Sequence, residues 1–248
     1  MGIKVFDIYD NNNQAVRDAY EMIAANIHIS NIEKKVKTIV LTSCNPKEGK
    51  TSLAISLSVA MANSGWRVLL IDADMRKPTA AKRLNEGTEH GLADFLAGKA
   101  ELCDVIRETN IILLNYLSCG SENPNLIGLI CSARFEELME KVRQEYDFVL
   151  FDTPALESVV DGALIASKAD AYLLVVKSGF TKLPSLVRAK EQLDSLNASI
   201  LGVVLNKVKK IDYKKHLSFY NYFFNSERFI KNVTRVKRIQ KQKQTINS

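Results

Sequence analysis

Residues 38–52 read TIVLTSCNPKEGKTS, and this stretch decides the fold. Its first part, residues 38–42, is a short β-branched apolar run that is typical of a buried strand. Its second part ends in Gly49-Lys50-Thr51 and opens a segment of helical character that continues to residue 63. A strand that passes through a Gly-Lys-Thr loop into a helix is typical of a phosphate-binding loop, because backbone N–H groups and the helix N-terminus attract phosphates.

Three side chains of this loop carry its expected chemistry. The ammonium of Lys50 can reach the β- and γ-phosphates of a nucleotide, and the hydroxyl of Thr51 can bind Mg²⁺. The usual pattern G-x-x-x-x-G-K-[ST] has glycine where Cys44 stands, and a helix N-terminus near Cys44 would lower the pKa of its thiol and make it oxidisable. From this loop alone, a helix that begins at Gly49 with a chance Lys-Thr is the alternative interpretation.

Outward from the loop, apolar runs alternate with helical patterns. The apolar runs lie at residues 67–71, 110–114, 147–151, 171–176 and 200–205, and the helical patterns lie at residues 13–30, 49–63, 132–146 and 184–196. Apolar runs separated by helices indicate a parallel sheet that is buried on both faces. The sequence therefore predicts the α/β class, with a doubly wound, mainly parallel sheet flanked by helices and with ligands at the carboxyl ends of the strands.

A second motif follows the apolar run at residues 67–71. Asp72 and Asp74 stand two residues apart at the expected end of a buried strand, where carboxylates are costly unless they are used. If the strand conformation persists, both side chains point the same way, toward the phosphate loop. Asp72 could then accept a proton from an attacking hydroxyl. A strand-end loop with helix-capping aspartates is the alternative.

A third motif and a fourth feature complete the set. Asp152 ends the apolar run Phe148-Val149-Leu150-Phe151, which is the Walker B arrangement of a carboxylate that holds Mg²⁺. Asn206 ends the run at residues 200–205, and its amide can both donate and accept, which suits the edge of an adenine ring. Carboxyl ends of parallel strands meet at one edge, so these groups are expected near the phosphate loop.

The three motifs together resemble the Walker A, Walker A′ and Walker B set of the bacterial tyrosine kinases (BY-kinases) of capsule and exopolysaccharide synthesis. That family lies within the MinD/ParA-like P-loop ATPases. The motifs in this chain are Pro46-Lys47-Glu48-Gly49-Lys50-Thr51, Asp72-Ala73-Asp74-Met75-Arg76 and Asp152-Thr153-Pro154. The resemblance extends over residues 13–206 and implies an ATP-dependent, autophosphorylating protein-tyrosine kinase that uses ATP and Mg²⁺.

The resemblance also implies residue roles. The implied catalytic residues are Lys50, Asp72 and Asp74, with Asp72 as the base. The implied metal ligands are Thr51, Asp74 and Asp152. The implied nucleotide-binding residues are Pro46, Lys47, Glu48, Gly49, Lys50, Thr51, Ser52, Arg76 and Asn206.

Two departures from the family pattern concern the loop and the first helix. The family has glycine where Lys47 stands, so a left-handed backbone at Lys47 would cost about 1 kcal/mol or more. The family's first helix often carries E-x-x-R-x-x-R, which supports a ring-shaped oligomer. The matching positions here are Asp18, Glu21 and Ala24, so both arginines are absent and the formation of a homo-oligomer stays open.

Charge divides the chain into an acidic body and a basic tail. Residues 1–206 carry a net charge of −4, and residues 207–248 carry +10. We expect a P-loop kinase domain with an N-terminal helix over residues 1–206 and a basic, aromatic-containing tail over residues 207–248. Such a tail is attracted to anionic surfaces such as a membrane. A solvated, frayed terminus is the alternative.

The tail contains the candidate phospho-acceptors Tyr213, Tyr220 and Tyr222. The family ends in a denser tyrosine cluster than this one. Packing of Tyr220 and Tyr222 with the neighbouring phenylalanines onto the body is an equally supported interpretation.

Composition predicts the compartment. The four cysteines show no metal-ligand spacing, the start of the chain has no apolar signal segment, and no apolar run approaches the ~20 residues of a membrane helix. We therefore expect a cytoplasmic protein. The resemblance implies recruitment to the inner face of the membrane by a transmembrane adaptor of the polysaccharide co-polymerase type, and a phosphotyrosine phosphatase as a further partner.

Two other functions fit parts of the pattern. A MinD/ParA-like ATPase switch would act on membrane or DNA, but such proteins usually place a lysine where Asn45 stands, and asparagine cannot supply that charge. A nucleotide-binding regulatory subunit without kinase activity is the third interpretation. The run from Asp72 to Pro78 favours the kinase.

Overall fold

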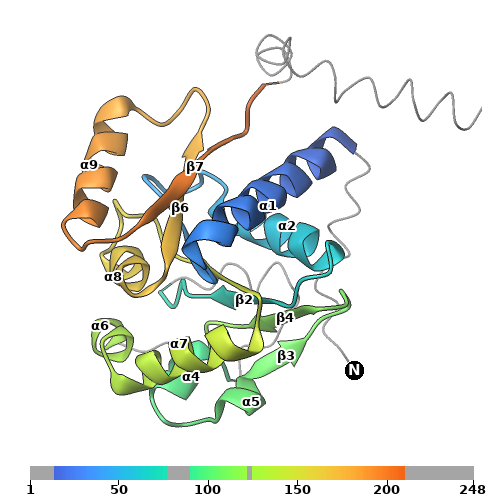
Figure 1. The fold of residues 1–248 in the computed structure, drawn as a ribbon. Coiled ribbons are helices and arrows are strands. Elements are labelled where there is room, and N and C mark those ends of the chain that lie inside the picture. Colours follow the sequence, from blue (N-terminus) through green and yellow to red (C-terminus); the bar gives the residue numbers. More distant parts are fainter. Residues whose placement is uncertain (1–13, 77–89, 122–124, 210–248) are drawn as a thin grey trace, which may run out of the picture. The chain divides into compact units, whose positions relative to one another are not determined.

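The computed structural model describes residues 14–76, 90–121 and 125–209 (Figure 1). The chain divides into two units, residues 1–207 and residues 208–248. All the elements described below belong to the first unit. The three candidate acceptor tyrosines and the rest of the tail from residue 210 lie outside the described residues.

The first unit is built around one seven-stranded sheet with the strand order β3-β4-β2-β5-β1-β6-β7. The strands are β1 (Thr38–Ser43), β2 (Val68–Asp72), β3 (Ile106–Glu108), β4 (Leu114–Leu117), β5 (Phe148–Asp152), β6 (Ala171–Lys177) and β7 (Ile200–Asn206). All neighbouring pairs are parallel except β3 and β4. The predicted doubly wound, mainly parallel α/β sheet is confirmed.

Helices cover both faces of this sheet (Figure 1). The helices are α1 (Gln14–Lys34), α2 (Lys50–Asn63), α4 (Leu92–Leu96), α5 (Leu102–Val105), α6 (Leu126–Ile130), α7 (Ala133–Glu145), α8 (Asp161–Lys168) and α9 (Leu183–Asp194). Side chains of α1 and α2 share one buried cluster with Ile39 and Leu41 of β1. Val40, between them, belongs to the other cluster, with side chains of α7, α8 and α9. Alternate residues of one strand thus enter two cores, which explains its continuous apolar sequence.

One expected strand was misplaced. The apolar run at residues 110–114 forms a hairpin tip, and the strand β4 begins only at its last residue, opposite the antiparallel β3. The hydroxyl of Thr109 donates to the carbonyl of Leu114 at 2.7 Å and accepts the N–H of Ile111 at 3.1 Å. Leu113 is left-handed, with φ 68°, and Ile112 is 84% exposed. Local side-chain hydrogen bonds override the apolar pattern here.

The first helix packs tightly at residue 24, one of the two positions where the family often has an arginine. Ala24 of α1 is fully buried in the cluster shared with α2, whereas Glu21 is exposed. An arginine at residue 24 would have no room in this packing. This face of α1 is therefore used within the protein.

A buried carboxylate organises the segment after β4, next to the end of β2. Asp94 accepts the N–H groups of Gly91 and Ser121, each at 3.0 Å. Burial by itself would raise the pKa of Asp94, but the hydrogen bonds from Ser121 and Gly91 outweigh it and hold the pKa below its ordinary value. The ionised form is thus the one that stabilises this loop.

Replacing Asp94 by asparagine is expected to lower the free energy of unfolding at pH 7 by about 1–2 kcal/mol, because the amide accepts more weakly than the carboxylate. The pKa is lower in the folded chain than in the unfolded chain, so this stabilisation is present above pH 3.8 and is lost as the pH falls through the folded value. Urea unfolding of both proteins at several pH values checks this. A difference that stays constant down to pH 2 would contradict it.

The part of the chain that the structure describes contains no helix that is long and apolar enough to cross a membrane.

Candidate active site

The carboxyl ends of the central strands bring the predicted acidic residues together. Asp72 at the end of β2 lies directly opposite Asp152 at the end of β5. Asp152 in turn lies opposite Leu41 of β1, one strand further along, and β1 leads into the phosphate loop. Asp72 is fully buried and Asp152 is 2% exposed. Two carboxylates held side by side in a buried position need a cation to offset their repulsion.

The phosphate loop, residues 44–49, joins β1 to α2. Gly49 has φ 100° and Lys47 has φ 65°, so two residues of the loop are left-handed. Lys47 thus takes the conformation that costs a residue other than glycine about 1 kcal/mol or more. The Nδ2 of Asn206 donates to the carbonyl of Glu48 at 3.0 Å, and the Nζ of Lys207 donates to the carbonyl of Lys47 at 3.4 Å. The end of β7 therefore supports the loop from outside.

Replacing Gly49 by alanine is expected to deform this loop. The added Cβ would lie 2.3 Å from the Nδ2 of Asn206, and φ 100° is unfavourable for any L side chain. We expect the affinity for Mg·ATP, measured by calorimetry, to fall at least about tenfold, since ~1.4 kcal/mol of distortion suffices for that. Gly65→Ala is the matched control, because Gly65 has φ 92° with nothing within 4 Å of its added Cβ. Equal affinities in the two variants would contradict the expectation.

Lys50 is the cation of this site. Burial lowers the pKa of its ammonium, and the carboxylates of Asp152, Asp74 and Glu48 oppose that effect by raising it. Lys50 begins α2 directly after Gly49, and its ammonium lies close enough to these carboxylates for each to influence its pKa. The structure thus brings Lys50 together with both acidic motifs, as predicted.

The second acidic motif does not keep the strand conformation beyond Asp72. β2 ends at Asp72, and the N–H of Ala73 donates to the carbonyl of Asp152 at 2.8 Å. The N–H of Asp74 then turns back to the Oδ1 of Asp72 at 3.1 Å. Asp74 still lies close enough to influence the pKa of Lys50. A turn stabilised by an aspartate, and not strand alternation, places it there.

Arg76, predicted to bind nucleotide, has a partner within the protein. Its Nε donates to one carboxylate oxygen of Asp161 at 2.6 Å, and its Nη2 donates to the other at 3.1 Å. Asp161 begins α8 and is 1% exposed. This two-pronged ion pair ties the Walker A′ motif to the helix that follows the Walker B motif. Nothing in the local sequence around residue 161 indicated this pairing.

Replacing Arg76 by alanine is expected to lower the free energy of unfolding by about 1–2 kcal/mol, because Asp161 would keep a buried charge without its cation. The value is below that of a fully buried pair, since the Arg76 side chain is 43% exposed. Urea unfolding measures it. Arg67→Ala is the control, because its ion pair with Asp147 is exposed on both sides. Equal losses in the two variants would argue against a special role of the Arg76 pair.

The donor set of this site suits Mg²⁺. Hydroxyl and carboxylate oxygens from Thr51, Asp74 and Asp152 are hard ligands, and Mg²⁺ is usually bound through one or two carboxylates, several waters and substrate phosphates. The described residues contain no group of three or more His, Cys, Asp or Glu arranged to hold a metal by themselves. The hydroxyl and carboxylate oxygens of Thr51, Asp74 and Asp152 fit a metal that is bound together with phosphate.

Cys44 differs from the expectation of a reactive thiol. It is 2% exposed, and burial, reinforced by the Glu48 carboxylate, raises the pKa of Cys44 to about 11. The thiolate is therefore disfavoured at neutral pH, and the expectation of a lowered pKa for Cys44 is wrong. Of the other residues predicted to bind nucleotide, Pro46 and Lys47 are exposed in the loop, and Ser52 lies in the first turn of α2.

Known proteins share the fold and about a third of the sequence with this chain. The family described as AAA domain matches residues 36–201. The tyrosine-protein kinase CpsD of Streptococcus agalactiae is 36% identical over 192 residues, which are 77% of this chain and 83% of that protein. The crystal structure of the chimerical protein CapA2B2 has a TM-score of 0.78 at 32% identity, covering 83% of this chain and 91% of that one. The septum site-determining protein MinD of Pyrococcus horikoshii, complexed with Mg-ADP, has a TM-score of 0.59 at 25% identity, over 68% and 69% of the two chains.

Fold and site together define a P-loop ATPase of the MinD type, a class of nucleotide-binding proteins. Within that class, the chain belongs to the family of bacterial protein-tyrosine kinases of capsule and exopolysaccharide synthesis. Both the expected fold class and the resemblance stated from the motifs are confirmed.

Proposed function

We propose that this protein transfers the γ-phosphoryl group of ATP to tyrosine hydroxyls, its own included, and so regulates the synthesis of a capsular or extracellular polysaccharide. The observation that carries the proposal is the placement of Asp72 opposite Asp152, which lies close enough to the partly buried Lys50 to influence its pKa. Kinship with tyrosine kinases supports the choice of tyrosine as the acceptor over a switch that only hydrolyses ATP.

In this proposal each side chain has one task. The loop N–H groups and the Lys50 ammonium bind the β- and γ-phosphates and neutralise charge that develops during transfer. Thr51, Asp74 and Asp152 would hold Mg²⁺, which supplies Lewis-acid stabilisation of the phosphates when bound.

Asp72 acts as the base. As the tyrosine oxygen forms its bond to the γ-phosphorus, the bond from that phosphorus to the bridging oxygen of ADP breaks. The phenolic proton goes to the carboxylate of Asp72. Asp72 is fully buried at the strand end, so little water competes for that position.

Asn206 has a different task in this proposal from the one its chemistry first indicated. Its Nδ2 donates to the carbonyl of Glu48, and its Oδ1 accepts the N–H of Lys207 at 2.8 Å. Both ends of the amide are thus engaged with the protein. We propose that Asn206 shapes the phosphate loop, in addition to any contact with an adenine ring through its second N–H.

The partner and the compartment follow from relatives and charge. The similar structure CapA2B2 is a chimerical protein whose name has two parts. This supports an adaptor protein as partner of the kinase fold. We propose a cytoplasmic protein that a transmembrane adaptor of the polysaccharide co-polymerase type recruits to the inner face of the membrane. The basic tail, with its +10 charge over residues 207–248, adds attraction to anionic lipid. A phosphotyrosine phosphatase would reverse the modification.

The proposal is tested by incubating the full chain with Mg·ATP, with and without the cytosolic segment of a candidate adaptor. Mass spectrometry should find phosphate on tyrosine, with Tyr213, Tyr220 and Tyr222 as the first candidates. ADP and free phosphate without phosphotyrosine in either arm would instead indicate a switch ATPase. ATP binding without turnover would indicate a regulatory subunit.

A further inference from the structure

The side chain of Glu48 is an unusual component of the phosphate loop, because it is a carboxylate with no exposed surface in a loop that binds anions. Its Oε2 accepts the N–H of Asn45 at 3.2 Å, and its Oε1 accepts the Nδ2 of Asn45 at 2.9 Å. The hydroxyl of Thr181 donates to the same Oε1. A buried carboxylate is tolerated when it is hydrogen-bonded in this way. These bonds hold the carboxylate of Glu48 inside the protein.

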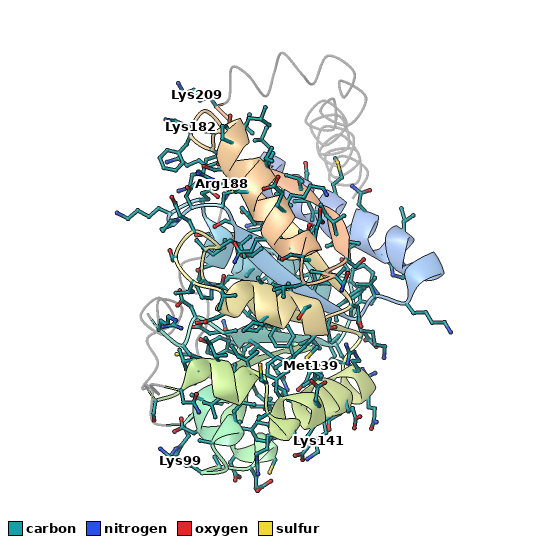
Figure 2. The ribbon with its side chains drawn as sticks, turned by 90° about the vertical axis from the view of Figure 1, so that its left-hand side faces the viewer. Lys99, Met139, Lys141, Lys182, Arg188 and Lys209 are labelled. Atoms are coloured by element: carbon teal, nitrogen blue, oxygen red, sulfur yellow. The ribbon has the colours of Figure 1, made fainter. Side chains whose placement is uncertain are left out.

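Thr181 comes from a distant part of the chain, the turn between β6 and α9. Its Oγ1 accepts the N–H of Lys177 at 2.9 Å, and its own N–H donates to the carbonyl of Lys177 at 3.1 Å. A hydroxyl has a single hydrogen, and Lys177 already supplies a donor, so the hydrogen of Thr181 points to Glu48. The following residue, Lys182, lies at the N-terminal end of α9 (Figure 2). The two hydrogen bonds to Lys177 thus fix the turn that carries Thr181, independently of its contact with the phosphate loop.

The loop needs such external contacts. Lys47 is held in a left-handed conformation at φ 65°, and Gly49 at φ 100°. A strained backbone of this kind persists only where the surroundings determine it. Two contacts from outside the loop hold Glu48: Asn206 binds its carbonyl, and Thr181 binds its carboxylate. Asn206 ends β7, whereas Thr181 lies in the turn between β6 and α9.

We infer that Thr181 is a positioning residue for the phosphate loop: through the buried Glu48 carboxylate, its hydroxyl holds the loop in the shape that binds the ATP phosphates. The same network explains Asn45. Its side-chain amide donates to the Oε1 of Glu48 within the same loop. The inference rests on the proposed binding of Mg·ATP. It identifies a residue outside all three motifs that supports this binding.

The test compares Thr181→Val with Thr181→Ser, which keeps the hydroxyl. Ser185→Ala, in the first turn of α9, is the matched control for loss of a hydroxyl in the same region. Calorimetry with Mg·ATP should show about a tenfold weaker Kd for Thr181→Val, the size expected for one hydrogen bond to a charged group. Thr181→Ser and Ser185→Ala should bind as the unaltered chain does. The rate at saturating Mg·ATP should change much less than KM, because the acidic groups are untouched.

A second measurement does not depend on nucleotide. Amide hydrogen exchange of residues 45–50 in the free protein should be faster in Thr181→Val than in Thr181→Ser. Glu48→Gln changes the acceptor of the Thr181 hydroxyl instead of the donor. It should speed the amide exchange of the same residues while the hydrogen bonds between Lys177 and Thr181 remain. If Thr181→Val changed neither the amide exchange of residues 45–50 nor the Kd for Mg·ATP, the inference would be overturned. The proposed function would not be affected by that result. A wild-type chain that binds no Mg·ATP would overturn the proposed function and the inference with it.

Discussion

Replacing Lys50 by methionine is expected to reduce tyrosine phosphorylation by at least about 10²–10³-fold, because the loop loses the charge that neutralises the transferring phosphoryl group. The fold should survive. Burial lowers the pKa of Lys50, so the folded chain disfavours its charged form, and at every pH below the lowered value that charge costs stability. The uncharged methionine removes this cost, and the melting temperature without nucleotide should stay equal or rise. Phosphotyrosine quantification and thermal unfolding measure both effects.

The control for Lys50→Met is Lys99→Met. Lys99 is exposed just beyond α4, at the periphery of the protein (Figure 2). Its replacement removes the same charge without touching the site, so activity should not change. Persistent phosphorylation in Lys50→Met would place the transfer elsewhere on the chain.

Replacing Asp72 by asparagine is expected to reduce phosphorylation by about 10²–10⁴-fold, the contribution of a positioned general base. Binding of Mg·ATP should be retained, since Thr51, Asp74 and Asp152 are proposed to hold the metal. Asparagine has nearly the same shape as aspartate, and it removes one of two facing buried carboxylates, so the stability should not fall. Single-turnover phosphorylation and calorimetry, used together, separate the chemical step from binding.

Asp104→Asn is the matched control, because Asp104 is exposed on α5 and its loss should leave both measurements unchanged. If Asp72→Asn lost Mg·ATP binding instead of turnover, Asp72 would be a metal ligand and not the base. Full activity in Asp72→Asn would exclude it from both roles.

Much of the fold could be predicted because its signals are local. The helix at residues 132–146 and the strand at residues 147–151 were placed within a residue or two of α7 and β5, since apolar periodicity reflects which faces are buried. The hairpin tip at residues 110–113 was missed, because a single threonine hydroxyl stabilised a turn that the apolar pattern contradicts. The short helices α4, α5 and α6 were missed as well, since five residues or fewer carry too little periodicity.

The candidate site divides in the same way. Lys50, Asp72 and Asp152 each follow an apolar run, so their position at the edge of the sheet was predictable before their mutual contact was known. Asp161 and Thr181 were not predictable. Each acts through a partner far along the chain, Arg76 for one and Glu48 for the other, at sequence separations of 85 and 133 residues.

The sequence alone determined that this chain alternates strands and helices, that three strands end in a phosphate loop or a carboxylate, and that these motifs are those of a tyrosine kinase. Only the tertiary structure decided that β5 inserts between β2 and β1, which sets Asp152 opposite Asp72 and close to the loop. It also sets the hydrogen bond between Thr181 and Glu48 and the burial of Cys44. Periodicity and motif chemistry depend on residues that are close in the sequence. Strand order, burial and hydrogen-bond partners depend on segments that meet only when the chain is folded.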